Sequence, residues 1–414
     1  MNTRQFDFPF PLRATSRFSP ALLPLVVGLL TCATTPSYGW DGLTFEQEAL
    51  VERHTRKEPS LSGPPVPTKS SAIRPAATPM PLKRAEAPPA ITWQLDGNTL
   101  TLDDYFKRQP VMALLIAKDG VIQYERYQFG RTAQHHYLSN SIAKSFTGLA
   151  MGFAQAEGKI PSFEALAQTY VPQMQGTAYG ETTLRNLMRM GSGVKFSESS
   201  LSVDMVSFGR VMYATGIVRA ASMFNNREAP QGSRFNYASV ETVVLSAVLQ
   251  AATGENVASY LEPRLWQAMG AEGEARWMQD DTGLSVTYCC LTALPHDYLR
   301  LGIVLANDGA RPDTGKQIIP REFLIDGTDW HKADEPFRPR PGSRGYSNLF
   351  WLLGGQARRF AMLGINGQAV FIDPGNKLVM VHFAVNQNVT VDNPGAAREF
   401  FALWRGVVQH YGKP

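Results

Sequence analysis

The sequence has little of what metal, nucleotide and nucleic-acid sites need. Its 414 residues include three cysteines and seven histidines, and these form no cluster with metal-ligand spacing. No glycine-rich phosphate-binding loop is present. The formal net charge of +4 is small and dispersed, which argues against a nucleic-acid surface. We therefore expect no metal, no cofactor and no nucleic-acid partner.

Long apolar runs are also missing. The run at residues 21–30 is too short to span a bilayer, for which about 20 residues are needed. Three arginines precede this run and small residues follow it, which is the pattern of a secretory signal peptide over residues 1–39. Two alternatives stay open: an uncleaved anchor, or a lipid on Cys32. We expect a periplasmic or secreted protein that meets the membrane only if Cys32 carries a lipid.

Two of the three cysteines, Cys289 and Cys290, are neighbours in the sequence. Adjacent cysteines rarely reach the geometry of a disulfide. We therefore expect two buried thiols and no disulfide framework, which export permits but does not require.

Proline is concentrated in one stretch. Nine of the 28 prolines lie between Pro59 and Pro89, among almost no large apolar residues. Such a segment cannot bury enough surface to offset the entropy of ordering it, so residues 40–90 are predicted to be a Pro-rich, disordered linker. Before the prolines, residues 43–57 could form one short helix. Residues 91–414 then form the folded unit, a length within reach of one large domain.

Strand-like segments lie at both ends of this unit, and helical patterns fill its middle. Residues 111–127 are typical of a hairpin, and residues 348–384 contain further strands. The stretch from Val240 to Gly254 has the pattern of a buried helix that ends at the glycine. This order predicts an α+β fold: an antiparallel sheet flanked by N- and C-terminal helices, with an inserted helical subdomain.

The stretch "SNSIAKSFTG" places Ser141 and Lys144 three residues apart at the start of an apolar helix. Such residues share a helix face, so the lysine could reach the serine hydroxyl. A serine becomes a nucleophile when a base takes its proton, and a lysine can be that base when its pKa is lowered. The other interpretation is an ordinary helix cap beside a surface lysine.

Other residues could support similar chemistry. Ser192 and Lys195 have the same spacing, but they lie in a glycine-flanked turn with no apolar helix behind it, which favours Ser141. His135 and His136 precede Ser141, but a histidine-based triad would also need a suitably placed acid.

Four stretches in the same order carry a resemblance to a known family: "SNSIAKSFTG", "TTLRNLMRMGSGV", "PQGSRFNYASVETVV" and "LGINGQAVFIDPGNKLVMV". They are similar to the serine β-lactamase and penicillin-binding-protein superfamily, above all to class C β-lactamase-like esterases and 6-aminohexanoate-dimer hydrolases. The resemblance covers most of residues 94–413. It implies a β-lactamase/transpeptidase-like fold and an acyl-enzyme formed on Ser141.

The resemblance also implies roles for a second motif, Tyr-x-Asn or Tyr-x-Ser. Tyr237-Ala238-Ser239 fits it, with the Tyr237 phenol near the nucleophile and Ser239 as a substrate-binding residue. Tyr346-Ser347-Asn348 matches literally and is the rival. We favour Tyr237 because it follows a proline and a glycine and leads into a long helix, as the family's tyrosine does.

The third motif departs from the family. Lys-Thr-Gly is usual there, whereas this chain has Ile365-Asn366-Gly367, without the cation that would hold a substrate carboxylate. The resemblance implies an oxyanion hole formed by the amides of Ser141 and Gln368, with Asn366 and Gly367 binding substrate.

These observations predict an exported serine hydrolase that acts on a small ester or linear amide through Ser141, Lys144 and Tyr237. Two alternatives remain: a β-lactamase or peptidoglycan peptidase, and a non-catalytic relative that binds penicillin or peptidoglycan. The stretch from Ser197 to Glu228 is expected to line the site.

Overall fold

The computed structural model describes residues 43–59, 69–199, 202–341, 343–386 and 395–412. The predicted signal peptide, Cys32 and residues 60–68 of the predicted linker lie outside these ranges. Within them, none of the helices combines the length and the apolar character needed to cross a membrane.

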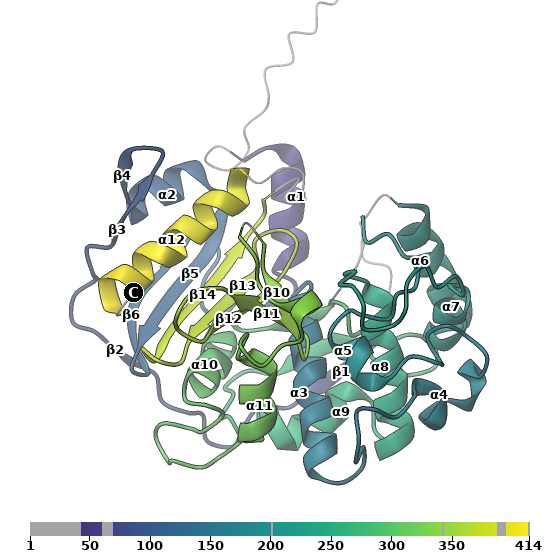
Figure 1. Ribbon diagram of the computed structural model, residues 1–414. Helices are drawn as coiled ribbons and strands as arrows, with labels where there is room; N and C mark the ends of the chain where they lie inside the picture. The colour runs from purple at the N-terminus through teal and green to yellow at the C-terminus, as the bar shows by residue number, and fades with distance from the viewer. Residues whose placement is uncertain (1–42, 60–68, 200–201, 342, 387–394, 413–414) are drawn as a thin grey trace, which may run out of the picture. The chain divides into compact units, whose positions relative to one another are not determined.

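Strands from both ends of the chain meet in the main sheet (Figure 1). Among the described residues it has eight strands in the order β10-β11-β12-β13-β14-β5-β6-β2. Neighbouring strands are antiparallel, except that β2 runs parallel to β6. The strands are β2 (Lys83–Arg84), β5 (Val111–Lys118), β6 (Val121–Tyr127), β10 (Gly345–Ser347), β11 (Phe350–Leu353), β12 (Arg359–Leu363), β13 (Ala369–Asp373) and β14 (Leu378–Ala384).

Local sequence explains the predicted hairpin. Asp119 and Gly120 connect β5 to β6, and both have positive φ, of 53° and 77°. A two-residue turn of this kind matches the twist of the flanking strands, and Asp-Gly adopts it at low cost. Strand β5 is buried over almost its whole length, which explains its continuous apolar run.

Helices cover both faces of the sheet. On one face lie α2 (Leu102–Arg108) and α12 (Gly395–Tyr411), where Trp404 stacks on Phe371 of β13 with 5.1 Å between ring centroids. On the other face α10 (Pro295–Ala306) packs closely, because a Cβ at Gly302 would collide with Val379 of β14. The fold is therefore layered helix on sheet on helix.

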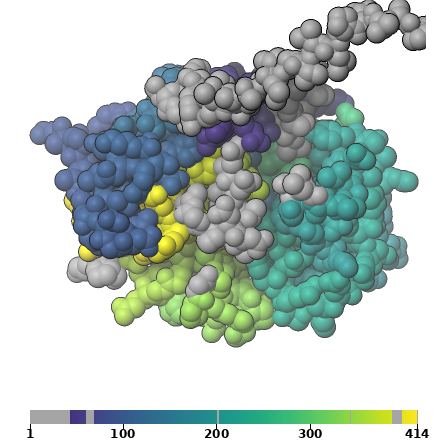
Figure 2. Space-filling model, turned by 90° about the horizontal axis from the view of Figure 1, so that it is seen from above, coloured from purple at the N-terminus to yellow at the C-terminus, as the bar shows by residue number. Residues whose placement is uncertain are grey.

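In the sequence, the inserted subdomain lies between strands β6 and β10 of the main sheet. Figure 2 shows its teal residues on one side and the blue and yellow residues of the sheet layers on the other. Besides α10, which packs on the sheet, the helices of this part of the chain are α3 (Ile142–Ala156), α4 (Ala167–Tyr170), α5 (Leu184–Met188), α6 (Val203–Thr215), α7 (Ile217–Ser222), α8 (Ser239–Thr253), α9 (Val257–Leu261) and α11 (Arg321–Thr328). The predicted fold class is thereby confirmed.

Two smaller sheets complete the described strands. One has the order β1-β8-β9-β7, and the other is the pair β3-β4. These strands are β1 (Ser70–Ile73), β3 (Thr92–Leu95), β4 (Asn98–Thr101), β7 (Tyr137–Leu138), β8 (Ala275–Met278) and β9 (Leu291–Ala293).

The described part of residues 40–90 contains the short helix expected before the prolines, whereas its proline-rich part differs from the predicted disordered linker. Helix α1 (Phe45–His54) has a capping box at Thr44 and buries Val51 and His54. Strand β1 pairs antiparallel with β8, and the buried Met80 donates its amide to the Gly270 carbonyl at 2.9 Å. The few apolar residues between the prolines meet partners about 200 positions away in the sequence, which local composition does not reveal.

Candidate active site

Ser141 stands where β7 leads into α3. It is the N-cap residue of α3, yet its side chain makes no capping hydrogen bond. Asn140 before it has a positive φ of 43°, a conformation that asparagine tolerates better than most residues. The chain therefore turns sharply into the helix and leaves the Ser141 hydroxyl free of the capping role that was the alternative interpretation.

Lys144 lies one helical turn further on and is not a surface lysine. It is 1% exposed, and its Nζ donates to Ser141 Oγ at 3.0 Å and to the Tyr288 carbonyl at 3.1 Å. Burial lowers the pKa of Lys144 to about 8, against the smaller opposing effect of the Glu198 charge. A useful fraction of the amine is thus neutral near pH 7, as a general base requires.

Tyr237 reaches the same point from the segment before α8. Burial and the Glu198 charge raise its pKa, while interaction with the Ser141 side chain lowers it. Its ring stacks on Trp351 with 5.3 Å between centroids, and Lys144 Nζ lies 4.8 Å from the ring centre. Ser141, Lys144 and Tyr237 therefore lie together, although Tyr237 follows Lys144 by 93 residues in the sequence.

The rival tyrosine, Tyr346, occupies a supporting position. It is buried in β10, and its ring meets the Tyr237 ring edge-on at 5.7 Å. It therefore packs against the Tyr237 ring, and it is Tyr237 that interacts with Ser141.

The third-motif residues connect β12 to β13 and are tied to the start of α3. Asn140 Nδ2 donates to Asn366 Oδ1 at 3.2 Å and to Gln368 Oε1 at 3.0 Å. Asn366 Nδ2 donates to the Asn386 carbonyl at 2.9 Å. Gly367 has a φ of 91°, and a Cβ there would lie 3.0 Å from Asn386 Nδ2. The network fixes Gln368 beside the residue that precedes Ser141.

Ser239 has a different partner from the predicted substrate. It is buried, its amide donates to Glu198 Oε2 at 2.7 Å, and its hydroxyl donates to Glu198 Oε1. Its predicted contact with substrate would require this pair to open, and that role stays a prediction.

The other candidates are engaged elsewhere. Ser192 is buried and donates to Glu241 Oε1 at 2.6 Å, whereas the exposed Lys195 pairs with Glu228 at 3.3 Å. His135 interacts with Thr132, and His136 contacts the Glu274 carbonyl at 2.8 Å. The second serine–lysine pair therefore lacks the contact that Ser141 and Lys144 make.

The prediction of two free thiols is wrong: Cys289 and Cys290 form a disulfide. Cys290 adopts a positive φ of 74°, which turns the chain so that the two neighbouring side chains meet. The ring is buried and directly follows Tyr288, whose carbonyl accepts from Lys144.

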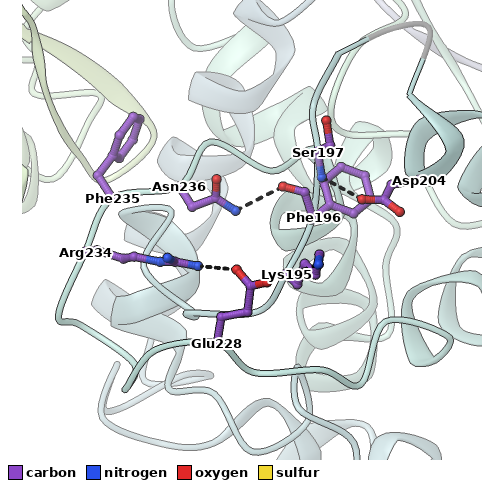
Figure 3. Close-up of a pocket in the computed structure, with 8 residues that line it drawn as sticks. All are labelled: Lys195, Phe196, Ser197, Asp204, Glu228, Arg234, Phe235 and Asn236. Atoms are coloured by element: carbon purple, nitrogen blue, oxygen red, sulfur yellow. Dashed lines mark hydrogen bonds and ion pairs between the residues drawn. The ribbon is translucent and has the colours of Figure 1, made fainter.

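The described residues also form a pocket of about 350 Å³, whose lining does not include Ser141, Lys144 or Tyr237 (Figure 3). Its walls include residues 195–197 and 234–236, which flank Glu198 and Tyr237. Arg234 and Lys195 both pair with Glu228, and Asp204 supplies the second negative charge that balances the two cations of the lining. Ser197, Asp204 and Glu228 are among its lining residues, and the expectation that the stretch from Ser197 to Glu228 lines the active site stays a prediction.

Sequence reasoning missed three contributors. Asn140 directly precedes the predicted nucleophile, which was a usable signal. Glu198 belongs to no recognised motif, and Tyr288 acts through its main-chain carbonyl, so its side chain gave no indication.

The chain is similar to several known proteins. A 6-aminohexanoate-dimer hydrolase of Paenarthrobacter ureafaciens is 24% identical over 343 residues, which cover 79% of this chain and 84% of that protein. A structure from Bacillus anthracis named as a 6-aminohexanoate-dimer hydrolase superposes with a TM-score of 0.71 at 24% identity, over 83% of this chain and 91% of that one. A family VIII carboxylesterase gives a TM-score of 0.54 at 15% identity, over 73% and 94%.

The two structures share the fold with this chain, and the predicted resemblance is confirmed at the level of the family. The family model described as β-lactamase matches residues 101–400. That match spans well over half of the 414 residues, and the chain belongs to the β-lactamase family.

Proposed function

We propose that this chain is an exported serine hydrolase that cleaves an ester or linear amide through an acyl-enzyme on Ser141. The observation that carries the proposal is the 3.0 Å contact between Lys144 Nζ and Ser141 Oγ, made by a lysine that is 1% exposed. A buried amine in contact with a serine hydroxyl is the arrangement that turns serine into a nucleophile.

Acylation begins with proton transfer. Neutral Lys144 takes the proton of the Ser141 hydroxyl, and Oγ forms a bond to the substrate carbonyl carbon. The carbonyl oxygen becomes an oxyanion, for which we propose the amides of Ser141 and Gln368 as donors. One such donor is worth about 3–4 kcal/mol in measured hydrolases.

Collapse of this intermediate breaks the bond to the leaving group. The leaving alcohol or amine needs a proton, and the protonated Tyr237 phenol next to Ser141 can deliver it and recover it from Lys144. Water then attacks the acyl-enzyme with the same groups in reverse roles, which releases the acid and restores Ser141.

The third motif supports an ester or linear amide as substrate. Both amide atoms of Asn366 are engaged, with Asn140 and with the Asn386 carbonyl, and no lysine replaces the one usual at this motif. The site thus lacks the charge at this position that would hold the carboxylate of a β-lactam. The relatives named as a 6-aminohexanoate-dimer hydrolase and a carboxylesterase favour the same substrate classes.

Export rests on the sequence alone, from the basic, apolar and small-residue order of residues 1–39. Fractionation of cells that produce the whole chain, with N-terminal sequencing of the product, would test it. A cytoplasmic product that still begins at Met1 would contradict it.

A substrate panel tests the activity. Wild type, Ser141→Ala and the matched control Ser192→Ala would be assayed with nitrophenyl esters, linear amides and a chromogenic cephalosporin. We expect ester or amide hydrolysis that Ser141→Ala abolishes and Ser192→Ala retains. Activity that survives in Ser141→Ala would end the assignment.

The same panel separates the alternatives. Cephalosporin hydrolysis as fast as ester hydrolysis would favour a β-lactamase. Tight β-lactam or muropeptide binding without turnover of any substrate would favour the non-catalytic relative.

A further inference from the structure

Glu198 is a charged residue beside the cluster that the mechanism above does not use. It lies between α5 and α6, is half-buried, and accepts the amide and the hydroxyl of Ser239. Ser239 is the first residue of α8, and the N-cap residue Ala238 offers no side-chain cap. The carboxylate therefore caps α8 from a distant segment, where the unpaired amides and the field of the helix favour a negative charge.

A second contact ties the same two segments together. Asn236 Nδ2 donates to the Phe196 carbonyl at 3.2 Å, as Figure 3 shows. The two contacts lie on either side of Tyr237 in the sequence, at Asn236 and Ser239. The main chain around Tyr237 is thus anchored before and after that residue to the segment that carries Glu198.

The charge of Glu198 also acts on Lys144 without an ion pair between them. It favours the ammonium form of Lys144, in opposition to burial. Burial raises the pKa of Glu198 itself, while Lys144 and the two hydrogen bonds from Ser239 oppose that rise and favour the carboxylate.

The other groups whose pKa values feel the Glu198 charge are tyrosines, which stay neutral near pH 7 because their pKa values are raised: Tyr179, Tyr237, Tyr288 and Tyr346. Charged side chains also lie on the same segment: Asp204 accepts from the Ser197 amide at 2.8 Å, and Lys195 pairs with Glu228.

We propose that Glu198 is a positioning residue for the hydrolase: its carboxylate fixes Ser239 at the start of α8, two residues after Tyr237, and stabilises the positive charge that Lys144 acquires when it takes the Ser141 proton. This inference rests on the proposed function for its effect on rate. Its effect on the charge of Lys144 can be measured without any substrate.

The first experiment follows the charge of Lys144 directly. Protein labelled with ¹⁵N-lysine would be titrated by NMR, with the Lys144 signal identified from its absence in Lys144→Arg. Loss of the Glu198 charge in Glu198→Gln removes a force that favours the ammonium, so the titration should move to lower pH, by about one unit. Glu198→Asp should keep the wild-type midpoint, and so should the exposed control Glu164→Gln. An unchanged midpoint in Glu198→Gln would overturn the electrostatic role.

The second experiment follows rate. In the pH profile of kcat/KM, the acidic limb of Glu198→Gln should shift to lower pH by as much as the NMR midpoint of Lys144. In Glu198→Asp the limb should lie at its wild-type position. Ser239→Ala keeps the Glu198 charge but removes the hydrogen bond from the Ser239 hydroxyl to Glu198. We therefore expect kcat to fall about tenfold while the acidic limb of the pH profile stays in place. Wild-type kcat in Ser239→Ala would overturn the positioning role.

The two proposals fail differently. Residual hydrolysis in Ser141→Ala would refute the proposed function and leave the NMR result valid. An unmoved NMR midpoint beside an inactive Ser141→Ala would refute the role of Glu198 alone.

Discussion

At the scale of single residues, the site depends on how one amine is buried. Lys144 would be an ordinary cation on a surface, but α3 places it among Tyr237, Tyr288 and the Ser141 hydroxyl. Burial disfavours the charged form of Lys144. The neutral amine can then act as the base that takes the proton of the Ser141 hydroxyl.

The pH dependence of activity follows from this burial. Lys144 must be neutral to accept the Ser141 proton, and its pKa is lowered to about 8. We therefore expect kcat/KM to rise with pH and to level off above about 8, with no fall caused by Tyr237, whose pKa is raised. Initial rates on one ester from pH 5 to pH 10 would measure this, and a limb with a midpoint near 6 would instead implicate a histidine.

At the scale of elements, the site is a junction between α3 and the turn from β12 to β13. The Asn140 side chain joins them through Asn366 and Gln368. Two elements from opposite ends of the catalytic unit are thus fixed relative to each other at the point where the oxyanion is expected.

Asn140→Gly tests this junction. Glycine tolerates the positive φ of residue 140, so the change removes the amide without straining the backbone. We expect kcat to fall about tenfold or more with a small change in KM, because one displaced oxyanion donor acts mainly on the transition state. Asp119→Gly, at a positive φ in the hairpin between β5 and β6, is the matched control and should retain wild-type kcat. Equal kcat in the two variants would show that the network is dispensable.

The disulfide is the second element-scale feature. Cys289 and Cys290 directly follow Tyr288, whose carbonyl holds Lys144. A dithiol that reduces the bond to two thiols frees the chain at this point, so we expect a loss of activity of about tenfold that reoxidation restores.

Mass spectrometry before and after reduction would show whether two hydrogens are gained on the peptide that carries both cysteines. The double variant Cys289→Ser/Cys290→Ser should be slow and insensitive to the dithiol. Full activity in that variant would exclude any influence of the disulfide on Lys144.

At the scale of the whole chain, a charged network joins α10 to the sheet. His296 contacts Glu125 of β6 at 2.9 Å and Glu272 at 3.3 Å, and Arg300 pairs with Glu272 at 2.6 Å. Burial would lower the pKa of His296, but the two carboxylates outweigh it and raise the pKa to about 9.

Stability should therefore depend on pH through His296. Because the pKa of His296 is raised in the folded state, its protonated form stabilises the fold. This contribution is fully present below about pH 6.5 and is lost as the pH rises through about 9. Wild type should exceed His296→Gln by about 1–3 kcal/mol in the free energy of unfolding near pH 6, and by much less near pH 10. Denaturant unfolding at both pH values would test this, and an equal margin at both would contradict it.

Local spacing and the order of the motifs were enough to predict the contact between Ser141 and Lys144 and the place of Tyr237. Ser141 and Lys144 share a helix face, so their contact follows from helical geometry. The position of Tyr237 followed from the family resemblance and the helix behind it. What local sequence could not reveal depends on distant partners: β1 on β8, Glu198 on Ser239, and the backbone turn that joins Cys289 to Cys290.

The most direct test of the central claim is covalent labelling of the nucleophile. The whole protein would be treated with a fluorophosphonate, digested and sequenced by mass spectrometry, beside Lys144→Met and Tyr237→Phe. The account predicts one adduct, on the peptide that carries Ser141, formed about a hundredfold or more slowly in Lys144→Met. No adduct on Ser141, or one that forms equally fast without Lys144, would contradict it.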